Sequence, residues 1–586
     1  MTASEKPLTL AADFPPASRD DWRALVEKVV GKAGLTPDAL VSHTYDGIEL
    51  RPLYTIDDSV GDIGLPGLSP YVRGSRPQGA VPDGWDVRQR HARPDPAAVL
   101  ADLENGVTSL WLAGIAPEHL PAVLSEVYLD LAPVVLDAGE QAEASAAAMF
   151  ELYEEKSVPA SAARGNLGAD PIGLRARTGR VQDLDVAVRL AKRCVADFPQ
   201  LRAVVVDGTP YHEAGASEAQ ELGVTIATGV AYLRALTDAG LSIDDALRQL
   251  EFRYAATADQ FLTIAKLRAA RRLWSRVADV SGGSSGAQHQ HAVTSAAMMT
   301  RRDPWVNMLR TTLACFGAGI GGAEAITVLP FDAALGLPDA FARRIARNTH
   351  ALLMAESHVA RVIDPSGGSW YVERLTDDLA RAGWTFFQEL EKAGGLPAAL
   401  RLAAEKIAAT QERRRDDIAH RRQPITGVSE FPHLAEKPVV RPAAPTTETG
   451  GLPRIRYAED FERLRDRSDA VLEKTGERPK VFLATLDKVA VHTARSTFAA
   501  NLLQAGGIEP VAGPPEDFAG SGAKIACVCS SDEVYVERAE ETVKALRAAG
   551  AERVLVAGRR SYGADQRIFA DCNAIEVLTS LMEVLA

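Results

Sequence analysis

The sequence predicts an α/β protein with two domains, a (β/α)8 TIM-like barrel followed by a flavodoxin-like, doubly wound domain. The chain has 586 residues, which is more than one hydrophobic core normally supports. Short apolar runs alternate with helical patterns in two separate regions, on either side of a segment at 437–453 that is rich in Pro, Thr and Gly. Strand–helix alternation implies parallel strands joined by right-handed crossovers, so each region should form a parallel sheet.

Residues 1–95 are expected to form an extended arm. The stretch LPGLSPYVRGSRPQGAVPDG is too rich in Pro and Gly for long regular structure. The pattern allows one helix, near Asp20–Ala33.

Residues 96–425 are expected to form the barrel, because eight strand candidates occur within roughly 260 residues. The candidates are VTSLWLAG from 107, PVVLDAG from 133, ARGNLGAD from 163, RAVVVDG from 202, LEFRYAAT from 250, QHAVTS from 290, EAITVLPF from 324 and ARVIDP from 360. Between them, segments such as SEAQELGVTIATGVAYLRALTDAG repeat apolar residues every three or four positions and end at a Gly, as helices do.

Residues 426–475 are expected to be a linker and residues 476–586 the second domain. Strand patterns in the second domain are KVFLATL, IEPVAG, AKIACVCSS and ERVLVAG, and the clearest helices are VERAEETVKALRAAGA and AIEVLTSLMEVLA. In such sheets ligands bind beyond the carboxyl ends of the strands. The stretch VAVHTARSTFAANLLQAGG, at 489–507, predicts a loop carrying His492 at that edge, followed by a helix.

Composition argues against several classes of partner. The formal net charge is −13 and no basic cluster is present, so nucleic acid and anionic membranes are not expected as partners. The start MTASEKPLTLAADFPP lacks the apolar core of a signal peptide, and no uninterrupted apolar run reaches the length of a membrane span. Five scattered cysteines without a C-x-x-C motif are typical of a reduced, cytoplasmic protein.

Two motifs suggest ligand sites that their context does not favour. The stretch GAGIGG at Gly317–Gly322 matches a dinucleotide fingerprint, but a helical pattern precedes it and a strand follows, which is the reverse of the order required. The stretch QHQH would place His289 and His291 on one face of a strand, as a metal pair would be. No third ligand is apparent nearby, so packing or hydrogen bonding at the barrel is the favoured interpretation.

Two other groups carry plausible barrel chemistry. Tyr211 and His212 follow an apolar strand directly, at the end of the barrel where such enzymes place their active sites. They could donate hydrogen bonds to a carbonyl, or they could simply begin the next helix. Arg361 and Asp364 are expected to form structural ion pairs, with each other or with a neighbouring strand.

Two long segments resemble the acyl-CoA mutase family. They are ARRIARNTHALLMAESHVARVIDPSGGSWYVERLTDDLARAGWTFFQELEKAGG at 342–395 and QPITGVSEFP at 423–432. Within that family the chain is similar to the small (β) subunits of methylmalonyl-CoA mutase, from PYVRGSRP at 70–77 to its end. The resemblance implies a barrel that encloses acyl-CoA, a cobalamin-binding-type second domain, and the interconversion of (R)-methylmalonyl-CoA and succinyl-CoA by adenosylcobalamin radical chemistry.

The family's cobalamin-binding pattern is K-x-G-x-D-x-H-x-x-G, followed by S-x-L and G-G. The histidine binds cobalt, the aspartate orients it, and the glycines let the nucleotide tail approach the backbone. His492, Ser530 and Gly558 match the pattern. The differing positions are Leu486 for the lysine, Lys488 and Arg495 for glycines, Ala490 for the aspartate, Asp532 for the leucine and Ala557 for the first glycine of the pair. Because loss of the orienting carboxylate alone costs roughly 10–100-fold in metal-site affinity, we interpret His492 as a remnant.

The barrel motif of the family is altered as well. Catalytic chains carry Y-H-x-x-E-A-G-A, whose histidine binds the substrate thioester carbonyl, whereas this chain has a version two residues shorter at 211–216. A displacement of about 1 Å can cost ~10²-fold in rate. The R-x-Y-A-G motif of the catalytic arm has no counterpart, and SPYVRGSRP stands there instead.

The resemblance therefore implies a non-catalytic small subunit that forms a heterodimer with a homologous large (α) subunit. Adenosylcobalamin would be bound by the large subunit, and no catalytic, cofactor-binding or metal-binding residue of this chain would be functional. Tyr211, His212, His492, Ser530 and Gly558 are then vestigial. The alternative is a self-sufficient acyl-CoA mutase that binds cobalamin through His492, and a corrinoid carrier is a third, less favoured possibility.

Overall fold

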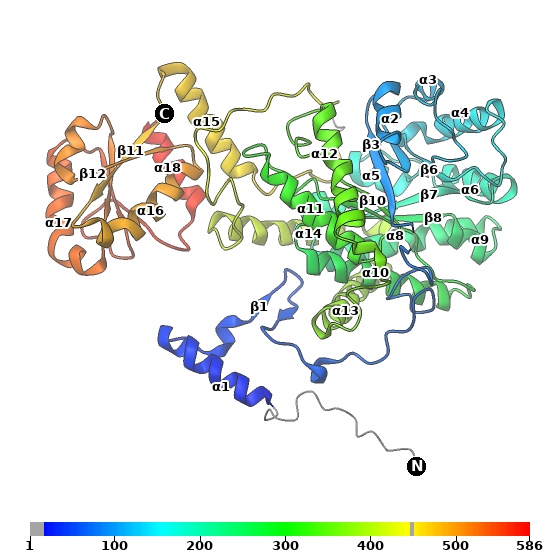
Figure 1. The fold of residues 1–586 in the computed structure, drawn as a ribbon, viewed down its shortest axis with the longest axis horizontal. Coiled ribbons are helices and arrows are strands. Elements are labelled where there is room, and N and C mark those ends of the chain that lie inside the picture. The colour runs from blue at the N-terminus through cyan, green and yellow to red at the C-terminus, as the bar shows by residue number, and fades with distance from the viewer. Residues whose placement is uncertain (1–16, 82, 446–449, 586) are drawn as a thin grey trace, which may run out of the picture.

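The computed structural model describes residues 17–81, 83–445 and 450–585. It contains a closed barrel of eight parallel strands and a separate parallel sheet of five strands (Figure 1). The predicted fold class, a TIM-like barrel followed by a doubly wound domain, is thus confirmed. Within the described residues, no helix has the length and apolar character needed to cross a lipid bilayer.

In its described residues, from 17 on, the arm contains one α-helix and little other regular structure. Helix α1, Arg19–Val30, begins with a capping box in which Ser18 and Asp21 bond to each other's backbone, and a 3₁₀ turn at Gly31–Ala33 follows it. Two short strands, β1 (Ser42–His43) and β2 (Glu49–Leu50), pair antiparallel. Helix α1 buries none of its residues and lies apart from the barrel (Figure 1).

The barrel closes in the strand order β10-β3-β4-β5-β6-β7-β8-β9. Its strands are β3 Asp86–His91, β4 Ser109–Ala113, β5 Val134–Asp137, β6 Gly165–Ala169, β7 Leu201–Asp207, β8 Leu250–Ala256, β9 Gln290–Thr294 and β10 Ala325–Thr327. Their outward-facing residues and the surrounding helices form one large apolar core.

Two strand predictions need correction. The first barrel strand is Asp86–His91, inside the segment assigned to the arm, and it was missed because its charged residues hide the apolar pattern. The last candidate, ARVIDP, is not a strand; Val359–Arg361 form a 3₁₀ turn, and His358 and Asp364 have positive φ. The other seven candidates are confirmed as β4 to β10.

Helices surround the barrel, and two long helices follow it. The helices between the strands are α2 Pro96–Leu103, α3 Leu120–Val123, α4 Ala142–Glu155, α5 Pro171–Thr178, α6 Asp185–Asp197, α7 Thr209–Glu213, α8 Glu218–Asp238, α9 Ile243–Arg248, α10 Gln260–Val280 and α11 Val306–Ile320. After the last strand come α12 Ala340–Ala351, α13 Trp370–Lys392 and α14 Leu396–Ala419. The GAGIGG segment spans the end of α11 and the turn before β10, so the predicted helix-to-strand connection is confirmed.

The second domain has the strand order β12-β11-β13-β14-β15, which in chain order is the 2-1-3-4-5 arrangement of flavodoxin-like folds. Its elements are α15 Glu459–Thr475, β11 Lys480–Thr485, α16 Val489–Ala505, β12 Glu509–Gly513, β13 Ile525–Cys529, α17 Asp532–Ala548, β14 Arg553–Ala557, β15 Gln566–Ile568 and α18 Ala574–Leu585. Apolar clusters lie on both faces of the sheet. Strand β15 was missed because only three residues form it.

Candidate functional site

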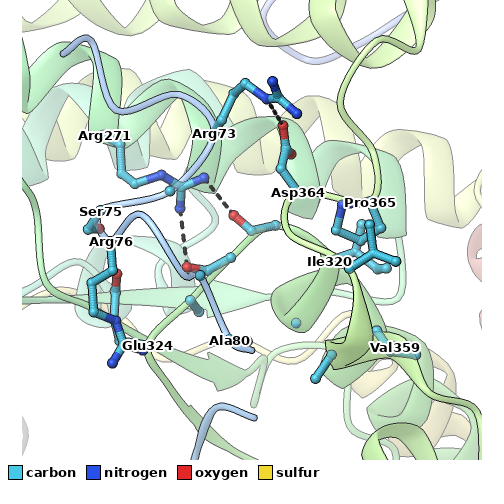
Figure 2. A pocket seen from close by; sticks show the side chains of 18 residues that line it. Arg73, Ser75, Arg76, Ala80, Arg271, Ile320, Glu324, Val359, Asp364 and Pro365 are labelled. Atoms are coloured by element: carbon cyan, nitrogen blue, oxygen red, sulfur yellow. Dashed lines mark hydrogen bonds and ion pairs between the residues drawn. The ribbon is translucent and has the colours of Figure 1, made fainter. Parts of the chain in front are cut away.

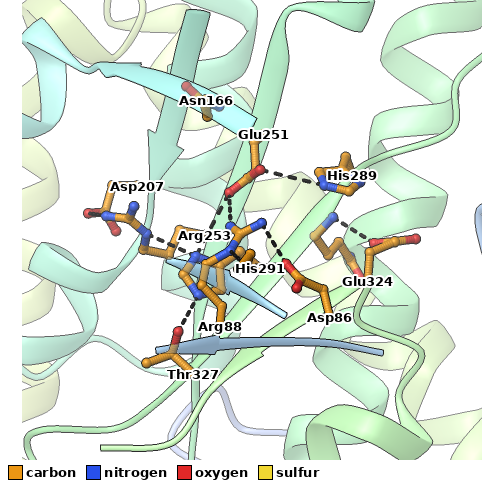
Figure 3. Close-up of polar contacts among 12 residues, drawn as sticks. Asp86, Arg88, Asn166, Asp207, Glu251, Arg253, His289, His291, Glu324 and Thr327 are labelled. Carbon is orange, nitrogen blue, oxygen red and sulfur yellow. Dashed lines mark hydrogen bonds and ion pairs between the residues drawn. The ribbon is translucent and has the colours of Figure 1, made fainter. Parts of the chain in front are cut away.

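Charged side chains occupy the interior of the barrel (Figure 3). Arg88 on β3 donates to Glu251 on β8 at 2.6 Å and to Ser109 on β4 at 3.1 Å. The Arg88 and Glu251 side chains are 4% and 1% exposed. Asp86 accepts a further bond from Arg88 at 3.1 Å. This buried ion pair joins strands on different sides of the barrel, so it occupies interior space that a channel along the barrel axis would need.

A second cluster lies nearer the carboxyl ends of the strands. Arg253 on β8 donates to Asp207 on β7 at 3.0 Å and to His291 on β9 at 3.3 Å. Its guanidinium carbon lies 4.1 Å from the ring centroid of Trp111 on β4. Strands β4 and β8 are diametrically opposite in the barrel order, so this cation–π contact spans the barrel interior. The axis is blocked where Trp111 and Arg253 meet.

The histidines of the QHQH segment take part in this network. His291 bonds to Thr327 on β10 at 2.8 Å through Nε2, and its Nδ1 lies 3.8 Å from Glu251. His289 lies 3.5 Å from the same carboxylate. Burial and the neighbouring arginines lower the pKa of both imidazoles well below the usual value, so both are neutral at pH 7. Within the described ranges no group of three or more His, Cys, Asp or Glu side chains is suited to hold a metal ion, and the favoured hydrogen-bonding interpretation matches the contacts.

The arm contacts the opposite end of the barrel, where the strands begin, and Figure 2 shows the pocket that Arg73, Ser75 and Arg76 of the arm line there. Ser75 of the arm donates to the carbonyl of Gln288 at 2.7 Å, just before β9. Arg271 of α10 donates a hydrogen bond to the carbonyl of Val72 in the arm at 2.9 Å. The cavity left beside Arg73, Arg76 and Glu324 has a volume of about 30 Å³. That is room for no more than a few water molecules.

Asp364 anchors the same region by ion pairing. It accepts from Arg73 of the arm at 2.8 Å and forms a close pair with Arg268 of α10. The structural ion pairing predicted for Asp364 is therefore present, but its partners are the arm and a helix. No contact joins it to Arg361.

His212 is held by protein groups on both ring nitrogens. Its Nε2 lies 2.7 Å from the Ser295 hydroxyl, and its Nδ1 lies 3.6 Å from Glu221. Burial would raise the pKa of the Glu221 carboxyl, but Lys266, at 2.5 Å, and His212 outweigh burial and lower it. Tyr211 and His212 are both almost fully buried in the short helix α7. Their side chains are thus part of the packed wall of the barrel.

In the second domain, His492 lies on a helix, which corrects the prediction of a loop. Helix α16 begins at Val489, with Lys488 as its N-cap residue in extended conformation. The imidazole is half-buried, and its Nδ1 lies 3.5 Å from Ser496 one turn further on. Ala490 is exposed. A serine hydroxyl at this distance is a weak substitute for an orienting carboxylate.

The carboxyl ends of β13 and β14 are occupied by side chains. Arg495 donates to the carbonyl of Ala557 at 2.6 Å and pairs with Asp532 at 3.1 Å. Its Nη1 would lie only 3.1 Å from a Cβ placed on Gly558. The space beside Gly558 is therefore filled by the guanidinium.

Tyr535 of α17 fills the adjacent position. Its hydroxyl donates to the carbonyls of Val528 and Ala557, both at 3.0 Å, and accepts from the Ser530 N–H at 2.8 Å. The Ser530 hydroxyl in turn donates to the carbonyl of Leu486 at 3.0 Å. Tyr535 is fully buried. Sequence reasoning missed it because a single aromatic residue in a helix has no distinctive pattern.

Sequence comparisons place this architecture in a known family. A profile described as methylmalonyl-CoA mutase matches residues 112–491. The methylmalonyl-CoA mutase small subunit of Streptomyces virginiae is 59% identical over 603 residues, which cover 98% of each chain. The small subunit of Propionibacterium freudenreichii subsp. shermanii is 40% identical, over 99% of this chain and 96% of that protein. The methylmalonyl-CoA mutase of Escherichia coli is 30% identical over 70% of this chain and 64% of that protein.

A TIM-like barrel joined to a flavodoxin-like domain, with this profile match, defines a mutase, which is a class of isomerase. The chain belongs to the methylmalonyl-CoA mutase family, and its full-length relatives identify it with the small subunits of that family.

Proposed function

We propose that the chain is the non-catalytic small subunit of a heterodimeric, adenosylcobalamin-dependent methylmalonyl-CoA mutase. A homologous large subunit would interconvert (R)-methylmalonyl-CoA and succinyl-CoA. This chain would support that subunit's stability or closure, and its arm would be a wrapping element. The proposal also includes a domain boundary at 425/426. It moves the end of the arm to residue 85 because β3 begins at Asp86, and it moves the start of the second domain from residue 476 to residue 459 because α15 packs on α18.

The observation that carries the proposal is the contact between Trp111 and Arg253 across the barrel. An acyl-CoA mutase of this family encloses the acyl-CoA in its barrel, which requires space along the axis. Opening the axis here would have to move Trp111, or to move Arg253 away from Asp207 and Asp137, its acidic partners at 3.0 and 3.4 Å. Breaking a buried pair in this way typically costs about 3–5 kcal/mol, which a bound CoA arm would have to offset.

The second domain supports the same proposal through a poor fit to cobalamin. The nucleotide tail would need the space beside Gly558, where Arg495 and Tyr535 bond to the Ala557 carbonyl. His492 has a hydroxyl neighbour at 3.5 Å where the family has a carboxylate. We therefore propose that cobalamin binds the large subunit and that this chain carries none.

The test is co-expression with the large subunit of the same organism, followed by size-exclusion chromatography and a cobalamin count per chain. The proposal predicts one cobalamin for each pair of different chains and none on this chain alone. If this chain alone binds one cobalamin and is active as a mutase, the proposal fails and His492 becomes a cobalt ligand. Stable cobalamin binding without activity would favour the corrinoid carrier.

A further inference from the structure

One face of the barrel carries large apolar side chains that nothing in the described part of the chain covers. Trp305 is the N-cap residue of α11, and Leu309 and Leu313 follow at intervals of four on that helix. Phe341 is the second residue of the neighbouring helix α12, and Leu352 follows its end. These five residues, which we name the α11/α12 stripe, are 44–66% exposed.

The stripe is continuous at its aromatic end. The ring of Phe331, which is buried, stacks on Trp305 at 4.9 Å and meets Phe341 edge-on at 6.1 Å. Helices α11 and α12 are in contact with each other on the outside of the barrel (Figure 1). The exposed residues of the two helices therefore belong to one surface.

The charge content of α11 is unusual for an outer helix of this barrel. Its fifteen residues include one charged side chain, Arg310, and that guanidinium is bonded to Asn307 and to the carbonyl of Thr426. Helix α6, which faces solvent, carries five charges in thirteen residues. A solvated outer helix normally has a charged face, so α11 has the composition of a covered helix.

Helix α8 also has an uncharged stretch, and in this chain another helix covers it. Residues 222–233 of α8 contain no charged side chain. Helix α13 covers them closely, because a Cβ on Gly223 would lie 2.7 Å from Phe386 and a Cβ on Gly383 would lie 2.9 Å from Leu222. The α11/α12 stripe has no such cover within the described residues.

The size of the stripe fits the core of a stable interface. A buried aromatic side chain covers roughly 150–250 Å², so Trp305 and Phe341, which are about half exposed, leave roughly 200 Å² to be covered, and the three leucines add to that area. A standard interface buries about 800 Å² on each partner, with an apolar core inside a polar rim. An apolar patch of this size on a monomer is often a binding site.

We propose that the α11/α12 stripe is the surface on which the homologous large subunit docks. The inference rests on the proposed function and adds to it the place of contact. Because the two subunits are homologous, the large subunit would carry counterparts of α11 and α12 on the same face, and a pseudo-twofold axis would bring the two helix pairs together.

The experiment compares two double variants of this chain, each co-expressed with the large subunit. Leu309→Asp with Leu313→Asp places two carboxylates in the stripe. Tyr128→Asp with Leu131→Asp is the matched control, because those residues are 74% and 69% exposed and lie before β5, away from the stripe. Dissociation constants come from sedimentation velocity over a dilution series, and circular dichroism checks that each variant is folded.

The stripe variant should bind the large subunit at least ~100-fold more weakly than the wild type, and the control should bind within about twofold of it. Equal binding by the stripe variant would overturn the proposal, as would a wild-type chain that uses the stripe to form a homodimer. Failure of the wild-type chain to form any complex would instead refute the proposed function. Hydrogen exchange on the unmodified complex is independent of the variants: the amides of α11 should exchange more slowly in the complex than in the free chain, and unchanged exchange would also overturn the proposal.

Discussion

The buried pair of Arg88 and Glu251 gives the sharpest test of the closed barrel. Replacing Glu251 by Gln keeps the size of the side chain but removes the charge that faces Arg88 at 2.6 Å. Arg88 would keep its bonds to Asp86 and Ser109, both at 3.1 Å, so its cation is not left wholly unpaired. Glu251 is also the acid nearest to His289 and His291.

The magnitude follows from the burial of both partners. Removing one member of a buried ion pair typically lowers the free energy of unfolding by 3–5 kcal/mol, and the remaining Asp86 contact favours the low end, about 3 kcal/mol. For a barrel of roughly 330 residues, with an unfolding entropy near 2.1 cal/mol/K per residue, that corresponds to a fall in Tm of about 4 °C. Replacing both partners, as Arg88→Met with Glu251→Leu, should recover most of the loss, because apolar pairs of similar volume often substitute well.

Differential scanning calorimetry of the purified chain, at several scan rates, measures the shift. The matched control is Glu143→Gln, which breaks an ion pair with Arg189 whose side chains are both more than half exposed. Its Tm should be nearly unchanged, since exposed pairs contribute little. If Glu251→Gln lowers Tm no more than Glu143→Gln does, the interior pair is solvated, and the argument that charged side chains close the barrel is refuted.

Three further predictions concern other parts of the chain. Burial raises the pKa of Asp46 to about 6, against 3.8 for the ordinary group, so the folded state binds its proton more tightly and this group should lower the free energy of unfolding by up to ~3 kcal/mol as pH rises from 4 to 7. Burial also raises the pKa of Asp170 to about 6, so in urea denaturation series at each pH Asp46→Asn should reduce the slope without abolishing it. Tyr535→Phe should lower the free energy of unfolding by about 1–3 kcal/mol, and it should speed hydrogen exchange at the Ser530 amide, which loses its acceptor. Tyr562→Phe is the control, because its ring lies 5.5 Å from that of Tyr535, and it should leave the exchange rate of the Ser530 amide unchanged. If the proposed function holds, His492→Ala should leave the cobalamin content and kcat of the complex with the large subunit within about twofold of wild type. A loss of tenfold or more would favour the alternative in which His492 binds cobalt.

The apolar runs predicted most of the fold because the outer faces of the strands are buried against helices whatever lies inside the barrel. Strand β3 was not predicted because Arg88, which points into the barrel, breaks the apolar pattern. The partner that makes its burial possible, Glu251, is 163 positions away in the sequence. A local signal did exist in LEFRYAAT, where Glu251 and Arg253 alternate with apolar residues and so share one face of a strand. Two buried charged residues at positions i and i+2 of a barrel strand indicate that oppositely charged partners lie across the barrel interior. Which residues those partners are depends on the order in which the strands close the barrel.

The position of His492 shows a different limit. The stretch at 489–507 predicted a loop carrying His492, although this chain has Lys488 and Arg495 at two positions where the family pattern has glycine. With side chains at these positions the backbone continues as regular helix from Val489, and Arg495 reaches the Ala557 carbonyl. The substitutions could be found in the sequence, whereas the contacts that replace the glycines could not.

The two altered sites follow one physical rule. Deleting the ligand contacts of a site leaves a cavity, and in protein cores an unfilled cavity destabilises by about 24 cal/mol for each Å³. A chain that no longer gains binding free energy from a ligand is more stable when its own side chains occupy the space. In the barrel the occupants are Trp111 and Arg253, which meet in a cation–π contact, and Arg253 is also bonded to Asp207. In the second domain they are Arg495 and Tyr535, both bonded to the Ala557 carbonyl. On this argument, removing Arg495 or Tyr535 alone should destabilise the second domain without creating cobalamin affinity, because the orienting carboxylate absent at Ala490 would still be missing.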